Sequence, residues 1–169
     1  MKKLLIGLSV LLVLLFSGCA PSSEQKPKVS SHEATKYKKA CDLNNGMGCT
    51  RLGLLYAEGK GIRKDYSEAR KYFSKACSLN NGLGCAVLAS YYQEEGRGVK
   101  QNLSKAVKYY SKACNLNDGI GCFQIGTFYA QGKGVKKDYL KAKKYFQKTC
   151  NLKFSRGCKA YKVLKRKGY

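Results

Sequence analysis

Apolar residues recur at helical spacing in successive segments of the chain. In 67–77 they fall at positions i, i+3, i+4, i+7 and i+8, occupied by Ala69, Tyr72, Phe73, Ala76 and Cys77. This spacing places them on one face of a helix, for which Ser67 is a favourable N-cap. The segments that end at Cys114 and Cys150 keep the pattern. Each of these segments therefore predicts an amphipathic helix.

A second apolar face begins at the cysteine that follows each of these helices. Cys85, Leu88, Ala89 and Tyr92 share one helical face, and the copies that begin at Cys49 and Cys122 repeat it. Two copies hold glycine in the middle of this face, which costs about 1 kcal/mol relative to alanine. Gly53 and Gly126 therefore predict that two helices cross too closely there for a side chain. A short Asn/Gly turn separates the two helices, so each unit predicts a helical hairpin.

The hairpins form a regular series. Cys41, Cys77, Cys114 and Cys150 follow one another at intervals of 36, 37 and 36 residues. Self-similarity at such a period is typical of a solenoid. We divide the solenoid into four units, 31–66, 67–103, 104–139 and 140–169.

Eight cysteines lie in these units, two in each. Every pair has seven residues between its members: Cys41 and Cys49, Cys77 and Cys85, Cys114 and Cys122, Cys150 and Cys158. Eight cysteines allow 105 disulfide connectivities, but identical spacing favours a bridge within each unit. Zinc is the competing interpretation, and it fits poorly because structural zinc sites favour cysteines two to four residues apart and His32 is the chain's single histidine.

The segment 126–150, "GTFYAQGKGVKKDYLKAKKYFQKTC", resembles a Sel1-like repeat, whose pattern is LG-x2-Y-x2-G-x-GV-x2-D-x2-KA-x2-(aromatic)2-x-KA. Sel1-like repeats with a cysteine pair in each unit are the mark of the Hcp-like cysteine-rich proteins that some bacteria export. The resemblance covers 31–169 and implies an all-α fold, a right-handed α/α solenoid of disulfide-bridged, TPR-like hairpins. The last unit departs from the pattern, because Lys162 and Lys165 stand at core-facing positions. Such residues suit a terminal repeat whose outer face meets water.

The N-terminus has the features of an export signal. Two lysines precede a thirteen-residue apolar run from Leu4 to Phe16, which is shorter than the roughly 20 residues that span a bilayer. The following "LFSGC" resembles a lipobox, so we expect a signal peptide over 1–18, a lipidated Cys19 and a flexible tether to residue 30. This predicts a lipid-anchored protein of the bacterial cell envelope, in the periplasm or at the outer membrane. The alternative is ordinary cleavage near Ala20 and secretion.

The chain is strongly basic. Its formal charge is +23, and loss of Lys2 and Lys3 with the signal leaves +21. Such a balance favours acidic partners, and export argues against nucleic acid. Anionic lipid headgroups, acidic polysaccharide and acidic protein remain, while a solvated basic surface without a partner is the simpler interpretation.

The lysines of the first helices follow a pattern of their own. Positions nine, six and two before the first cysteine lie together, roughly opposite the apolar face, at about 100° per residue. They are occupied by Lys71 and Lys75 after Glu68, by Lys105, Lys108 and Lys112, and by Lys141, Lys144 and Lys148. In related helical repeats the first helices line the concave side. We therefore expect a protein or another acidic envelope ligand to bind these eight lysines on the concave face.

The resemblance also implies a second function, because several Hcp-like proteins are described as penicillin-binding and as weak β-lactam hydrolases. β-Lactams or peptidoglycan fragments would then be ligands. Serine β-lactamases need S-x-x-K with S-D-N and K-T-G, but here the one S-x-x-K is Ser23 to Lys26, in the tether, and the other motifs are absent. A single histidine cannot build a zinc β-lactamase site. We therefore predict no metal and no cofactor, and we can name no nucleophile.

The hydroxyl and acidic residues of the repeats have simple structural interpretations. Four serines begin or lie along the first helices, where capping or exposure explains them: Ser67, Ser74, Ser104 and Ser111. Glu94 and Glu95 accompany a one-residue insertion in a loop, and we expect them to be solvated charges. The sequence thus favours a binding scaffold over an enzyme.

Overall fold

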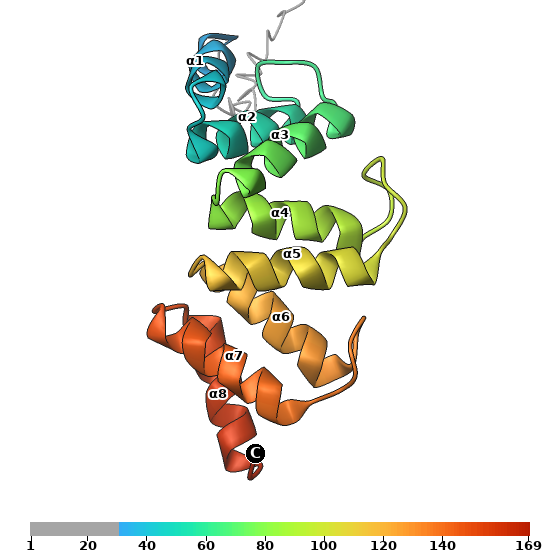
Figure 1. Cartoon of the computed structure of the whole chain (residues 1–169), viewed down its shortest axis with the longest axis vertical. Helices are drawn as coiled ribbons and strands as arrows, with labels where there is room; N and C mark the ends of the chain where they lie inside the picture. The colour runs from blue at the N-terminus through green and yellow to red at the C-terminus, as the bar shows by residue number, and fades with distance from the viewer. Residues whose placement is uncertain (1–30) are drawn as a thin grey trace, which may run out of the picture.

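The computed structural model describes residues 31–169, which form eight helices and no strand. The helices are α1 (Ser31–Asp42), α2 (Gly46–Glu58), α3 (Tyr66–Ser78), α4 (Gly82–Gln93), α5 (Leu103–Asn115), α6 (Gly119–Gln131), α7 (Tyr139–Asn151) and α8 (Ser155–Arg166). They pair into four antiparallel hairpins that stack in chain order, with α1 at one end and α8 at the other (Figure 1). The predicted all-α solenoid is confirmed.

A disulfide closes the joined ends of the two helices in every hairpin. The bridges are Cys41–Cys49, Cys77–Cys85, Cys114–Cys122 and Cys150–Cys158, with Cα atoms 4.3 to 4.5 Å apart. Six of these eight cysteines are fully or almost fully buried. The first three bridges therefore belong to the core and fix their turns from inside, while Cys150–Cys158 is partly exposed.

The Asn/Gly turns reverse the chain through one left-handed residue each. Asn44, Asn80 and Asn117 have φ between 57° and 61°, a region that asparagine enters more readily than most residues. The residue that follows caps the second helix: Asn81 Oδ1, for example, accepts the backbone N–H of Gly84 at 2.8 Å. In the fourth hairpin Lys153 takes the left-handed conformation, and α8 begins without a side-chain cap.

The start of α3 differs from the prediction. Ser67 is not the N-cap, because Asp65 takes this role and accepts the backbone N–H groups of Ser67 and Glu68 at 2.8 and 3.0 Å. A carboxylate at a helix N-terminus also interacts favourably with the helix dipole. The helix therefore begins at Tyr66.

Successive hairpins pack most closely at the predicted glycines. A Cβ atom built on Gly53 would lie 2.7 Å from Cε1 of Phe73, and one on Gly126 would lie 2.8 Å from Cε1 of Phe146. Both distances are far below van der Waals contact. The close crossing that the glycines predicted is confirmed, and it brings α2 against α3 and α6 against α7.

The two lysines that replace core residues in the last unit lie at the surface. Lys162 and Lys165 are exposed, while Leu164 on the other side of α8 is buried. This agrees with a terminal repeat whose outer face meets water. Within 31–169 none of the helices is long and apolar enough to cross a membrane. The predicted signal peptide, Cys19 and the tether lie outside the described residues.

Candidate functional site

Eight lysines predicted to bind a ligand lie on α3, α5 and α7, and we call this set the basic strip. It comprises Lys71, Lys75, Lys105, Lys108, Lys112, Lys141, Lys144 and Lys148. In α5 and α7 the two lysines farther from the cysteine are exposed. In α3 Glu68 takes the first position, and Lys71 is exposed. The lysine nearest the cysteine is partly buried in all three helices. The helix geometry thus keeps one row of cations per repeat at the surface. Their role in binding remains a prediction.

Stacked tyrosines lie between the hairpins, and the sequence analysis missed them. Tyr56 stacks on Tyr72, Tyr92 on Tyr109 and Tyr129 on Tyr145, with centroids 5.5 to 5.7 Å apart and ring planes within 11° of parallel. In every pair the first ring comes from the second helix of one hairpin and the second from the first helix of the next. The tyrosines of the three pairs occupy equivalent positions in successive repeats. This recurrence is the signal in the sequence that could have revealed the pairs.

Two lysines of the basic strip contact these tyrosines. Lys105 Nζ lies 5.1 Å from the ring centroid of Tyr92, and Lys141 Nζ lies 5.4 Å from that of Tyr129. A cation over an aromatic face is held by the ring quadrupole, with about 0.5 to 1 kcal/mol at exposed sites. Lysines of the strip and stacked tyrosines are therefore in contact at two boundaries, between α4 and α5 and between α6 and α7.

Within the described residues, the boundary between the first and second hairpins lacks such a lysine–tyrosine contact. Glu68 occupies the α3 position that corresponds to Lys105, and it forms an ion pair with Lys71. This hydrogen bond raises the pKa of Lys71 above its ordinary value. Lys71 is therefore fully protonated at neutral pH and presents a cation, not a neutral amine.

A groove of 480 Å³ lies where α3 meets α4. Its lining combines three cations, two serines, a leucine and a tyrosine: Arg70, Lys71, Lys75, Ser74, Ser78, Leu88 and Tyr92. A smaller hollow of 430 Å³ follows the strip toward the C-terminus, beside Tyr129 and Lys141. Such linings suit a ligand that carries carboxylate or phosphate groups next to apolar ones.

The groove provides little for nucleophilic catalysis. An active-site serine needs a neighbouring base, but Lys71 is protonated and Ser78 donates its hydroxyl to the backbone carbonyl of Lys75 at 2.8 Å. Ser74 is exposed on α3. The groove therefore offers positive charge and hydrogen-bond donors to a ligand more readily than it offers an activated hydroxyl.

The remaining candidate groups are structural. Glu94 pairs with Arg97 at 2.8 Å, and Glu95 is exposed in the same loop. Ser104 is exposed at the first turn of α5 and Ser111 is partly buried along it. No three His, Cys, Asp or Glu side chains in the described part of the chain are grouped so as to hold a metal ion.

Fold and surface together define a class, the disulfide-bridged helical-hairpin repeat proteins. The Sel1 repeat model matches residues 46–81, 82–118 and 119–154, so the chain belongs to the Sel1 repeat family. Each matched unit runs from the second helix of one hairpin into the first helix of the next. With a bridge in every hairpin, the chain is a cysteine-rich protein of the Hcp type, and Sel1 repeats generally mediate protein interactions.

Three relatives illustrate this membership. Cysteine-rich protein B of Helicobacter pylori superposes with a TM-score of 0.63 at 40% identity, over 80% of this chain and 98% of that one. A Sel1 repeat protein from Oxalobacter formigenes superposes with a TM-score of 0.69 at 33% identity, over 75% of this chain and 51% of that one. A protein named beta-lactamase HcpA from Helicobacter pylori is 38% identical over 79 residues, 40% of this chain and 32% of that protein. The chain thus matches about a third of HcpA's length. The bridges and these relatives together indicate an extracytoplasmic protein.

Proposed function

We propose that this protein is an exported binding scaffold whose basic strip docks an acidic segment of another protein. The observation that carries the proposal is the recurrence of the same arrangement on α5 and α7, where Lys105 and Lys141 lie over the rings of stacked tyrosine pairs. A repeated row can bind a repeated or extended ligand along its length. A single charged patch would not have this property.

Electrostatics support an acidic partner. Packed helices lie about 8 to 10 Å apart, close to the Debye length of about 8 Å at physiological salt. Neighbouring rows of lysines therefore reinforce one another at the position of a bound carboxylate. The Tyr92 ring in the groove adds apolar contact area, so we expect a segment that combines Asp or Glu with apolar residues.

The test begins with crosslinking in intact cells, which identifies the bound partner. Purified partner is then titrated against the parent and against a variant with Lys105, Lys108, Lys141 and Lys144 changed to Gln, all four of which are exposed. We expect at least a tenfold loss of affinity and a weaker salt dependence, because four charge pairs between lysines and the acidic segment are lost.

A matched control separates the strip from the overall charge. Changing Lys36, Lys60, Arg63 and Lys100 to Gln removes the same number of exposed cations from α1 and the loops. The control should bind as the parent does. Equal affinity of the strip variant and the parent would mean that the lysines are only a solvated surface.

Weak β-lactam hydrolysis is the second candidate function. It is favoured by the name of HcpA and by a groove that holds Ser74 and Ser78 among cations. The ion pair of Lys71 with Glu68 and the hydrogen bond of Ser78 to the backbone carbonyl of Lys75 argue against efficient turnover, so we expect no multiple turnover of a chromogenic cephalosporin by the oxidised protein. A covalent adduct on Ser74 that disappears in Ser74→Ala, with turnover to match, would establish the hydrolase instead.

The lipid anchor is the remaining part of the proposal. The lipobox-like "LFSGC" ends at Cys19, so Cys19→Ala should release the protein from the membrane fraction of cells. Mass spectrometry of the mature N-terminus reports the attached lipid directly. Cleavage before Ala20 with an unmodified chain would instead indicate secretion.

A further inference from the structure

The outward face of α8 takes the place of an interface between repeats. In α2 the corresponding positions join the next hairpin, since Gly53 lies against Phe73 and Tyr56 stacks on Tyr72. In α8 they hold Lys162 and Lys165, both exposed. This face lies at the opposite end of the stack from α1 (Figure 1).

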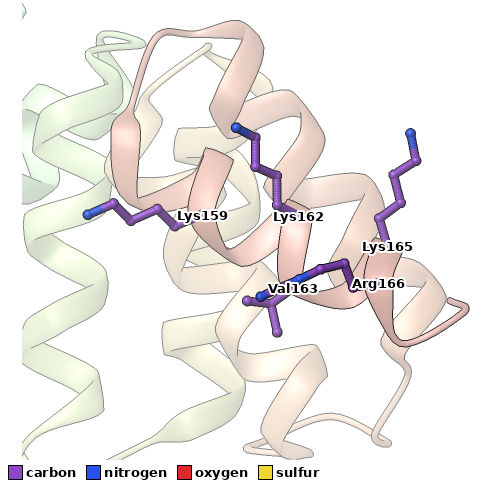
Figure 2. A pocket seen from close by; sticks show the side chains of 5 residues that line it. All are labelled: Lys159, Lys162, Val163, Lys165 and Arg166. Atoms are coloured by element: carbon purple, nitrogen blue, oxygen red, sulfur yellow. The ribbon is translucent and has the colours of Figure 1, made fainter.

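Four cations and one valine form this face, which we call the α8 shelf. Lys159, Lys162, Val163, Lys165 and Arg166 line an open hollow of 730 Å³. Figure 2 shows their side chains spreading outward from the same helix. Because all five residues belong to one helix, the hollow is a shelf open to solvent and not a cleft between elements. Val163 is 40% exposed among the cations.

Solubility alone does not explain the charge of the shelf. A terminal repeat needs a polar outer face, which a mixture of acids and bases would supply. Residues 139–169 instead contain eleven Lys or Arg and no Asp or Glu. Like charges three and four positions apart repel one another on a helix, as Lys162 does with Lys165 and Arg166. The single sign therefore costs helix stability and favours an anionic partner.

We propose that the α8 shelf docks on an anionic lipid surface. A basic helix face with an exposed apolar residue is typical of helices that lie on membranes, and a broad surface fits a shelf better than a small ligand does. Each Lys or Arg near an anionic leaflet contributes about fivefold to partitioning. The shelf acts separately from the basic strip, so this contact does not depend on the proposed protein partner.

A second copy of the chain fits the shelf poorly. Head-to-tail stacking would bring α1 against α8, and α1 exposes Lys36 and Lys39 besides Lys38, which pairs with Asp42. Two shelves face to face would also oppose cations to cations. Association through this face therefore requires an external anionic surface.

Vesicle binding tests the proposal. The mature chain from residue 19, with Cys19→Ala so that it cannot be lipidated, is floated with vesicles of phosphatidylcholine alone or with added phosphatidylglycerol, at low and high salt. We expect binding only to the anionic vesicles, weakened by salt. Changing Lys159, Lys162, Lys165 and Arg166 to Gln should lower partitioning by about 100-fold or more.

Two controls sharpen the test. The variant with Lys36, Lys60, Arg63 and Lys100 changed to Gln loses the same charge and should bind within about fivefold of the parent, since these groups lie away from the leaflet. The basic strip variant should also bind vesicles as the parent does, which separates this proposal from the protein partner. Circular dichroism and a non-reducing peptide map verify that each variant is folded and bridged.

Three results would overturn the proposal. The first is equal binding to both kinds of vesicle. The second is an equal loss in the shelf and control variants, because net charge and not the shelf would then drive binding. The third is a parent protein that binds soluble polyglutamate but not anionic vesicles, together with a shelf variant that no longer binds polyglutamate. This result would assign the shelf to an acidic polymer.

Discussion

Thr50 and Asn81 join two successive hairpins through one hydrogen-bonding position. The Thr50 hydroxyl lies 2.9 Å from Oδ1 of Asn81 and 3.0 Å from the carbonyl oxygen of Gly46, so its single proton serves one of these acceptors at a time. Oδ1 of Asn81 also accepts the backbone N–H of Gly84. The cap of α4 is therefore tied to α2 of the preceding hairpin, and Thr50 is completely buried.

Thr50→Val tests the strength of this link. The variant keeps the shape of the side chain and removes the donor, so the free energy of unfolding should fall by about 1 kcal/mol, the typical net value of a buried hydrogen bond. The control is Thr127→Val, because Thr127 bonds only to the carbonyl of Phe123 within its own helix and should cost less. Urea denaturation of both variants gives the comparison, and equal losses would contradict a special role for Thr50.

Gly53→Ala tests the close approach of α2 and α3. Its Cβ would lie 2.7 Å from the Phe73 ring, which is itself fully buried, so we expect a loss of about 1 to 3 kcal/mol from overpacking. Gly119→Ala in α6 is a matched control, since its nearest neighbour, Cβ of Phe154, lies at 3.4 Å. There the better helix propensity of alanine should leave stability unchanged or raised. A neutral Gly53→Ala would show that Phe73 can move aside.

The repeats made much of the fold predictable from sequence. Four imperfect copies can be compared with one another, so the apolar faces, the bridges and the glycine crossings follow from positions that recur. Gly53 and Gly126 were informative because a glycine inside a helix is unfavourable without a packing reason. Their contacts with Phe73 and Phe146 supply that reason.

Two features depended on geometry that the sequence does not specify. Ser67 and Asp65 are both good N-cap residues, and only the backbone path shows that the N–H groups point at Asp65. The stacking of Tyr92 on Tyr109 depends on the rotation between consecutive hairpins, which helical periodicity does not give. The positions of the strip lysines on α3, α5 and α7 were predictable, whereas a ligand for them was not.

The bridges should supply a large part of the stability. In the chain-entropy estimate a loop of nine residues gives about 2.5 kcal/mol per disulfide. Changing Cys77 and Cys85 together to Ala should lower the unfolding free energy by about this amount, measured by urea denaturation. Reduction of all four bridges should cost about 10 kcal/mol, comparable with the total stability of a domain. Helical circular dichroism that persists unchanged after complete reduction would contradict this estimate.

Tyr110 should make the protein sensitive to alkaline pH. Its side chain is 1% exposed and its hydroxyl donates to Oε1 of Gln93 at 2.9 Å. Burial raises the pKa of Tyr110 to about 12, from the ordinary 10.0. The folded state therefore holds this proton more tightly than the unfolded state, so the contribution to stability is complete below pH 10 and is lost as the pH rises toward 12.

Tyr110→Phe separates this effect from the ionisation of the lysines, which both proteins share. At pH 8 the variant should be less stable by about 1 kcal/mol, because the hydrogen bond to Gln93 is missing. Between pH 10 and 12 only the parent loses the part of its unfolding free energy that depends on a protonated Tyr110. This loss amounts to roughly 3 kcal/mol when the pKa rises from 10.0 to about 12. The variant should therefore become the more stable protein near pH 12. Urea denaturation across this range measures the difference, and a constant difference at every pH would mean that Tyr110 titrates alike in both states.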